Sequence, residues 1–166
     1  MTATKTTTLK VTLPSEKEIV LTREFAAPRN LVFEAFIKPE HLRRWWGRRD
    51  DTLSVCEVDP RVGGAWRYVI RKANGKEEPF KGEFREIVAP ERLVYTFIYD
   101  VDGFRDPGGL VEDVFHEKGG KTTLVETMHF PSQHARDETL KFGMVAGAEE
   151  TLDRLAELLA TLVKEK

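Results

Sequence analysis

The chain has 166 residues, of which 26 are lysine or arginine, 28 are aspartate or glutamate and one is cysteine. This length fits one domain, and 40% apolar with 33% charged residues is typical of a folded soluble protein rather than a disordered one. A net charge of −2 argues against nonspecific binding to nucleic acid or to an anionic membrane. A single cysteine excludes an internal disulfide framework and a CxxC metal site.

The N-terminal segment carries no targeting or membrane signal. No apolar run approaches the roughly 20 residues that span a bilayer, and Lys5, Lys10 and Lys17 interrupt any signal-peptide core. We therefore expect a cytoplasmic protein with a loose polar tail over residues 1–7 and a single domain over residues 8–166. Neither nucleic acid nor membrane is an expected partner, and both a monomer and a homodimer stay open.

The first part of the chain predicts two strands followed by two short helices. Apolar and polar residues alternate over residues 9–13, and residues 19–25 are rich in β-branched side chains, so both segments favour strands. Pro28 suits the first turn of a helix, and Pro39 opens a second helix that Gly47 ends. The two helices, with a break between them, form one unit.

The middle of the chain predicts an antiparallel meander. Short turns, including the strong hairpin signal Asn74-Gly75, separate segments in which apolar residues alternate, so consecutive strands should pair. The predicted strands span residues 52–59, 65–72, 80–88, 93–100, 110–117 and 122–130.

One long amphipathic helix is predicted from about Asp137 to Val163, because apolar residues recur there at spacings of three and four. Such a helix buries its apolar stripe only against the concave face of the sheet. The element order therefore predicts an α+β domain, with a curved antiparallel sheet wrapped around the C-terminal helix. A gap between the two is a place where small ligands bind. The residues expected to bury against the sheet are Val145, Leu152, Leu155 and Leu159.

Aromatic residues on the predicted strands supply a candidate ligand site. Trp66 and Tyr68 share one strand face, and Tyr95, Phe97 and Tyr99 share a face of another strand. Ordinary core packing explains most such stripes, but buried tyrosine hydroxyls need hydrogen-bond partners. If the sheet leaves a cavity, these hydroxyls can orient a flat, partly polar ligand.

Trp45 and Trp46 are adjacent at the end of the second short helix. Neighbouring helical residues point about 100° apart, so one tryptophan packs inward while the other faces a partner or the mouth of a cavity. The simpler interpretation is a hydrophobic plug that closes one end of the sheet. Both interpretations place the pair at the rim of the core.

Gly143 and Gly147 lie four residues apart on the predicted long helix and share a face. Each glycine costs roughly 1 kcal/mol relative to alanine inside a helix, so something should offset that cost. Either another element approaches closely, or the pair leaves room for a ligand.

Several titratable residues lie on the last two strands. A His–Glu pair there could act as acid and base, but a surface salt-bridge ladder is the favoured interpretation. The four histidines have no metal-ligand spacing such as HxxxH, and no nucleophile elbow or phosphate loop is present. We therefore expect no metal, no cofactor and no catalytic residue. The strand residues concerned are Glu112, Asp113, His116, Glu126 and His129.

A set of motifs resembles the SRPBCC superfamily of START-like, helix-grip domains, and within it the activator of heat-shock protein 90 ATPase homologue-like branch. The resemblance covers roughly residues 17–163 and is strongest for the fold. The matching segments are REFAAP at 23–28, PEHL at 39–42, WWG at 45–47, DPRVGG at 59–64, GEFREI at 82–87, PERLV at 90–94 and LDRL at 152–155.

The resemblance implies a helix-grip fold and noncatalytic binding of a small hydrophobic, aromatic ligand between sheet and helix. The alternative is a chaperone-associated interaction module of the stress response; the eukaryotic activators pair this domain with a separate N-terminal domain that we do not expect here. A third possibility is a cyclase- or hydratase-type enzyme. The residues expected to contact a ligand are Trp45, Trp66, Tyr68, Phe84, Tyr95, Phe97, Tyr99, Met128, Gly143 and Gly147.

Overall fold

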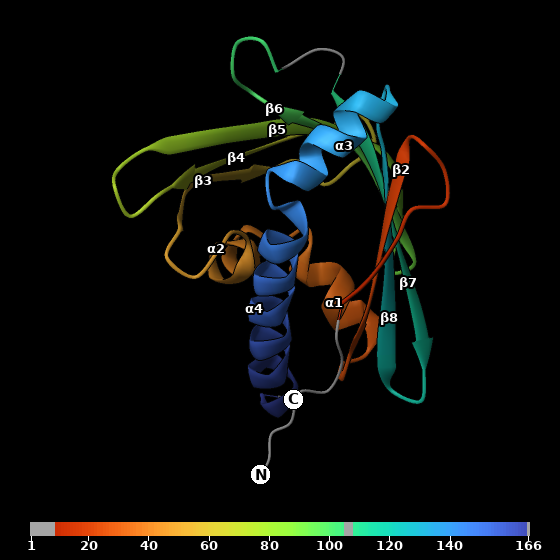
Figure 1. The fold of residues 1–166 in the computed structure, drawn as a ribbon. Helices are drawn as coiled ribbons and strands as arrows, with labels where there is room; N and C mark the ends of the chain where they lie inside the picture. The colour runs from red at the N-terminus through yellow and green to blue at the C-terminus, as the bar shows by residue number, and fades with distance from the viewer. Residues whose placement is uncertain (1–8, 105–107, 166) are drawn as a thin grey trace.

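The computed structural model describes residues 9–104 and 108–165, so the tail expected over residues 1–7 lies outside the described residues. Figure 1 shows a curved sheet with the helices gathered on one side of it. The elements in chain order are β1 (Lys10–Thr12), β2 (Glu18–Phe25), α1 (Arg29–Ala35), α2 (Pro39–Trp45), β3 (Thr52–Val58), β4 (Ala65–Arg71), β5 (Glu77–Val88), β6 (Arg92–Tyr99), β7 (Gly109–Lys118), β8 (Lys121–His129), α3 (Gln133–Lys141) and α4 (Met144–Lys164).

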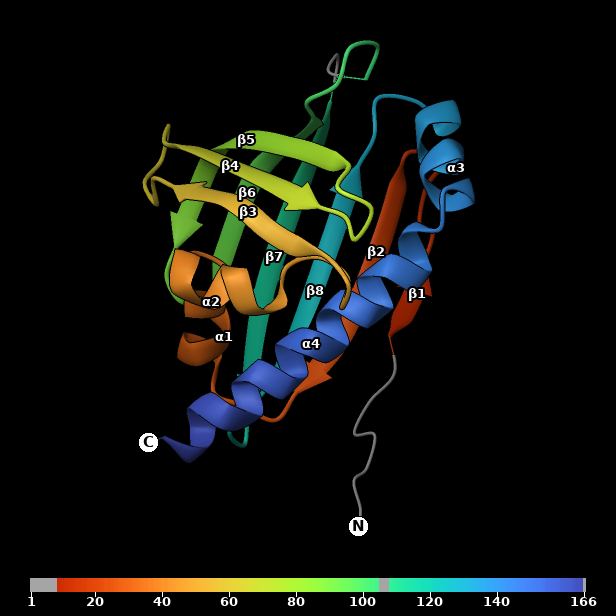
Figure 2. The same ribbon diagram turned by 90° about the vertical axis from the view of Figure 1, so that its left-hand side faces the viewer.

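The strands form one antiparallel sheet in the order β1-β2-β8-β7-β6-β5-β4-β3. The predicted meander is therefore continuous from β3 to β8, and β2 returns to pair with β8. In β2 every second residue is buried, from Ile19 to Phe25, which assigns one face of the sheet to the core. Figure 2 shows α4 running across this concave side, so the predicted helix-grip architecture is confirmed.

The core lies between the concave face and helices α1, α2 and α4. Leu152, Leu155 and Leu159 of α4 are all buried in it, and Leu155 is 0% exposed. Val145 is only partly buried, because it lies in the first turn of α4, beyond the three leucines that face the sheet. The apolar stripe of the C-terminal helix is therefore confirmed over its middle and later turns.

The C-terminal helix is broken, which corrects the single helix predicted from about Asp137. Helix α3 ends at Lys141 and α4 begins at Met144. Between them Phe142 is 79% exposed and Gly143 has φ +82°, in the left-handed region that favours glycine. The apolar repeat lies within α4, whereas α3 is mostly polar, so the repeat does not mark the residue at which the helix begins.

Candidate ligand-binding cavity

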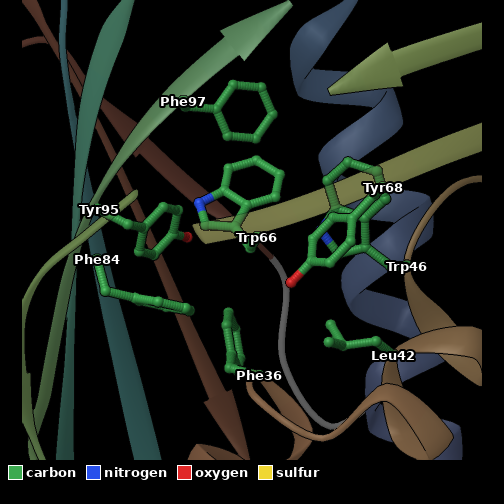
Figure 3. A pocket seen from close by; sticks show the side chains of 8 residues that line it. All are labelled: Phe36, Leu42, Trp46, Trp66, Tyr68, Phe84, Tyr95 and Phe97. Carbon is green, nitrogen blue, oxygen red and sulfur yellow. The ribbon is translucent and has the colours of Figure 1, made fainter. Parts of the chain in front are cut away.

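A small cavity, partly open to solvent, lies between the aromatic strands and the C-terminal end of α2 (Figure 3). Its volume is about 30 Å³, which is room for a water molecule rather than for an aromatic ring. Seven of its eight lining side chains are aromatic, and such a lining is typical of small-molecule sites. The lining residues are Phe36, Leu42, Trp46, Trp66, Tyr68, Phe84, Tyr95 and Phe97.

A glycine on β5, Gly82, shapes the strand wall of the cavity. Trp66 of β4 pairs with Gly82 of β5. A Cβ added to Gly82 would lie 2.4 Å from Trp66 Nε1 and 1.9 Å from the Thr96 carbonyl oxygen of β6. Glycine at this position therefore lets the Trp66 indole lie across β5 while β5 and β6 approach closely.

Trp45 and Trp46 point in different directions, as their adjacency predicts. Trp45 is buried beside Phe36, with ring centroids 5.0 Å apart, and its Nε1–H donates a hydrogen bond to the Ala35 carbonyl at 2.8 Å. Trp46 is half-buried and packs edge-on against Tyr68 of the cavity wall, with centroids 4.8 Å apart. Trp46, rather than Trp45, is thus the tryptophan of α2 that closes the cavity.

Arg154 of α4 holds the backbone on either side of Trp46. Its Nη1 donates to the carbonyl oxygens of Gly47 and Arg48 at 2.8 and 2.9 Å, and its Nη2 donates to the Arg44 carbonyl at 2.9 Å. The Thr151 hydroxyl also donates to Gly47 O at 3.2 Å. These bonds satisfy carbonyls at the end of α2, which have no partner within the helix. They fix the backbone on both sides of Trp46 at the rim of the cavity.

Polar atoms of Trp66, Tyr68 and Tyr95 interrupt the aromatic wall. Among the described residues no partner accepts a hydrogen bond from Trp66 Nε1, although the residue is buried. The Tyr95 hydroxyl donates to Asp113 Oδ2 of β7 at 2.7 Å. Figure 3 shows the ring nitrogen of Trp66 on the side of the indole that faces Tyr95, and the Tyr68 hydroxyl turned toward the cavity.

Asp113 and Glu126 form a carboxyl pair behind Tyr95, which corrects the surface ladder expected for both residues. They are direct partners across β7 and β8, and Asp113 is 0% exposed. Burial first, and then the charge of Glu126, raises the pKa of Asp113 well above its usual value; burial also raises the pKa of Glu126. Since no donor reaches Asp113 Oδ1 among the described residues, the two carboxyls are expected to share a proton.

The neighbouring residues on the outer face do form the expected ladder. His129 Nε2 lies 3.0 Å from Glu112 Oε1, and Arg92 Nη2 lies 2.6 Å from Glu112 Oε2. The hydrogen bond with His129 and the Arg92 charge lower the pKa of Glu112. His116 is exposed. Strand alternation therefore separates the polar residues of these two strands into an outer ladder and an inner pair.

The carboxyl pair predicts how stability depends on pH. Because the folded state keeps a proton that unfolded carboxyls release, the free energy of unfolding should fall as pH rises above about 4.5, by up to about 1.4 kcal/mol per pH unit. Glu126→Gln supplies an amide donor to Asp113 in place of the shared proton. Urea denaturation between pH 5 and 9 should therefore show a flatter profile for this variant.

The exposed, ion-paired Glu86 on β5 provides the matched control for that experiment. Glu86→Gln should keep the slope of the unmodified protein, because this exposed carboxylate takes no part in the buried pair. Parallel profiles for the unmodified protein and Glu126→Gln would mean that the buried pair holds no extra proton.

The structure brings together half of the residues that the sequence suggested for ligand contact. Trp66, Tyr68, Phe84, Tyr95 and Phe97 all line the cavity. Their role in binding a ligand stays a prediction. Sequence reasoning passed over Phe36 and Leu42, whose signal is the helical spacing of apolar residues around Pro39. It placed the Trp45-Trp46 pair at the rim but chose Trp45 rather than Trp46 as the residue that contacts a ligand.

The other suggested residues lie outside the cavity lining. Tyr99 stacks on Phe80, with ring centroids 5.3 Å apart, and also contacts Phe104. Met128 is partly buried on β8, opposite β2 and β7. Trp45 belongs to the core beneath α2. These residues support the wall of the cavity rather than form it.

Gly143 and Gly147 have separate explanations. A Cβ on Gly143 would meet nothing within 4 Å, so neither a ligand site nor a close neighbour requires this glycine; its positive φ does. A Cβ on Gly147 would lie 3.2 Å from Arg48 Nη2. Gly147 thus makes room for a closely approaching side chain, which was one of the two explanations that the sequence left open.

Other reactive chemistry is sparse in the part of the chain that the structure describes. Cys56 is buried, and burial raises the pKa of its thiol to about 11, so it is not a thiolate near neutral pH. Among these residues no group of three or more His, Cys, Asp or Glu side chains is placed to hold a metal ion. None of the described helices is long and apolar enough to cross a membrane.

A curved sheet that grips a C-terminal helix over an aromatic cavity defines the START-like class of domains. Residues 26–160 match the family model described as activator of Hsp90 ATPase homolog 1-like protein. The chain therefore belongs to this family. No match is found among curated proteins.

Solved structures of bacterial proteins share the fold. A protein from Rhodobacter sphaeroides is 25% identical with a TM-score of 0.87, over 93% of this chain and 99% of that one. A protein from Nitrosomonas europaea is 26% identical with a TM-score of 0.82, over 92% and 99%. A protein from Staphylococcus epidermidis is 29% identical with a TM-score of 0.78, over 90% and 93%. These likenesses agree with a fold that typically binds ligands or proteins.

Proposed function

We propose that this domain binds a small, flat aromatic molecule in the cavity between the sheet and α2, without changing it chemically. The observation that carries the proposal is the lining of the cavity, in which aromatic rings from the ends of α1 and α2 and from three strands surround a small space. Offset and edge-on packing against such rings favours a flat aromatic guest over a branched aliphatic one. The family supports a binding role of this general kind.

The ligand must enlarge the cavity to enter. An apolar cavity of about 150 Å³ accommodates benzene, whereas the volume here is about 30 Å³. Trp46 is the side chain suited to move, because it is half-buried and lies just beyond the last residue of α2. Its rotation exposes the cavity without disturbing the backbone that Arg154 holds. This ring is therefore the gate of the proposed site.

The three tryptophan indole N–H groups provide the test. Heteronuclear NMR titrations with toluene, phenol and indole should shift the signals of Trp46 and Trp66, which line the cavity, with dissociation constants of about 1 mM or below. Trp45 is the internal control, because its N–H is bound to the Ala35 carbonyl outside the cavity and should shift least.

Absence of any shift at Trp46 and Trp66 with all three probes would contradict the proposal. The alternative expected from the family, a chaperone-interaction module, would then gain support if heat-shock protein 90 perturbed exposed residues of the domain while the indole signals of the cavity stayed in place.

A further inference from the structure

Trp66 and Tyr95, which both line the cavity, carry complementary hydrogen-bonding groups. Their rings are nearly perpendicular, at 89°, with centroids 6.0 Å apart. The Trp66 indole has only a donor, and this donor is buried without a partner among the described residues. A buried polar group that lacks a partner is destabilising and calls for an explanation.

Tyr95 offers the opposite chemistry. Its proton is engaged with Asp113 Oδ2, so toward the cavity its oxygen has only lone pairs to give. The carboxyl pair maintains this direction. When the shared proton lies between Asp113 Oδ1 and Glu126, Oδ2 remains an acceptor, and the Tyr95 hydroxyl keeps pointing its hydrogen away from the cavity.

A hydroxyl is a single group that can accept a hydrogen bond from Trp66 Nε1 and donate one to the Tyr95 oxygen. A carbonyl can accept from the indole but offers Tyr95 nothing, and an N–H group can donate to Tyr95 but leaves the indole unpaired. The surrounding lining is aromatic, with Phe84 and Phe97 on either side of Tyr95 in the view of Figure 3.

We propose that the cavity selects aromatic molecules that carry a hydroxyl, with the hydroxyl between Trp66 Nε1 and the Tyr95 oxygen and the ring toward Phe36 and Trp46. This inference rests on the proposed function, since it names the ligand class of the same cavity. It assigns Trp66 and Tyr95 as the residues that determine specificity, and Asp113 as a positioning residue that acts through Tyr95.

Phenol and toluene separate this inference from the proposed function, because they differ in little but a hydroxyl in place of a methyl group. In a purely apolar cavity phenol should bind at least tenfold more weakly, since its hydroxyl would lose water without gaining a partner. In the cavity described here phenol should bind at least as tightly as toluene, as measured by calorimetry or by NMR titration.

Conservative variants then locate the hydroxyl. Trp66→Phe and Tyr95→Phe should each lower the preference for phenol over toluene at least fivefold. Tyr99→Phe removes a hydroxyl outside the cavity lining and is the matched control, which should keep the preference within about twofold. The preference is a ratio, so a general change in cavity size or folding affects both probes. An amide NMR spectrum of each variant confirms that it folds.

Three outcomes would overturn the inference. If phenol binds tenfold more weakly than toluene, the proposed function stands, but a buried water or nothing at all occupies the polar end. If the preference collapses in Tyr68→Phe instead, the hydroxyl lies elsewhere in the cavity. If neither phenol nor toluene binds, both the proposed function and this inference are wrong.

Discussion

Gly82→Ala should destabilise the domain by at least about 3 kcal/mol, the largest effect that we expect from adding one methyl group. The added Cβ would lie 1.9 Å from the Thr96 carbonyl oxygen and 2.4 Å from Trp66 Nε1. The first contact is with backbone, so β5 and β6 must separate. The second displaces the indole that forms the cavity wall. Urea denaturation measures the loss directly.

Gly109→Ala on β7 is the matched control. Gly109 is also a strand glycine without a positive φ, but its Cβ would lie 3.4 Å from the nearest atom, the His129 carbonyl oxygen. We expect this variant to lose less than about 1 kcal/mol. Equal losses in the two variants would mean that β5 and β6 do not approach as closely at Gly82 as described.

Leu155→Ala should cost about 2–5 kcal/mol of unfolding free energy, because it removes a fully buried side chain and leaves a void between α4 and the sheet. Leu155 is 0% exposed and lies in the core with Leu152, Leu158 and Leu159. Equilibrium chemical denaturation of the variant checks this value.

Val163→Ala, near the end of the same helix, is the control for Leu155→Ala. Val163 is 40% exposed, so its truncation should change stability by about 0.5 kcal/mol or less. A loss below about 0.5 kcal/mol for Leu155→Ala would place α4 with a different face toward the sheet.

The strands were predictable because alternation reports directly which side chains face the core. Residues Trp66, Tyr68 and Ile70 alternate on β4, and all three are buried as that pattern indicates. The hairpin signal at Asn74-Gly75 likewise falls between β4 and β5. Sheet order then follows from short connections between antiparallel strands.

The break between α3 and α4 was not predictable from periodicity. The left-handed conformation of Gly143 is a backbone property, and the polar sequence of α3 carries no apolar repeat that would mark where one helix ends and the next begins. The local sign of the break is Gly143 itself, which follows the exposed Phe142. The cost that we assigned to Gly143 within a helix is therefore absent, because the residue precedes α4 rather than lying inside it.

The inner carboxyl pair was missed for a different reason. Asp113 alternates with Val111 and Phe115, so the pattern of β7 already places it on the core face. The general rule that acids lie outside outweighed that signal. Exceptions to this rule mark polar networks and functional sites, and here the exception lies directly behind the cavity tyrosine.

The two halves of the cavity were also unequally predictable. Strand residues such as Tyr95 and Phe97 could be placed on one wall from alternation alone. Trp46 could not be chosen over Trp45, because adjacency predicts that the rings diverge without saying which one faces the cavity. That choice depends on how α2 packs, and therefore on contacts such as those of Arg154 with the end of the helix.

The central claim, that the aromatic cavity is a binding site, is tested most directly by intermolecular nuclear Overhauser effects in the protein saturated with phenol. The account predicts contacts from the phenol ring protons to Phe36, Tyr95 and Phe97, and from the ring to the indole N–H of Trp66. Contacts only with exposed side chains such as Phe142, or with none of the cavity residues, would contradict it.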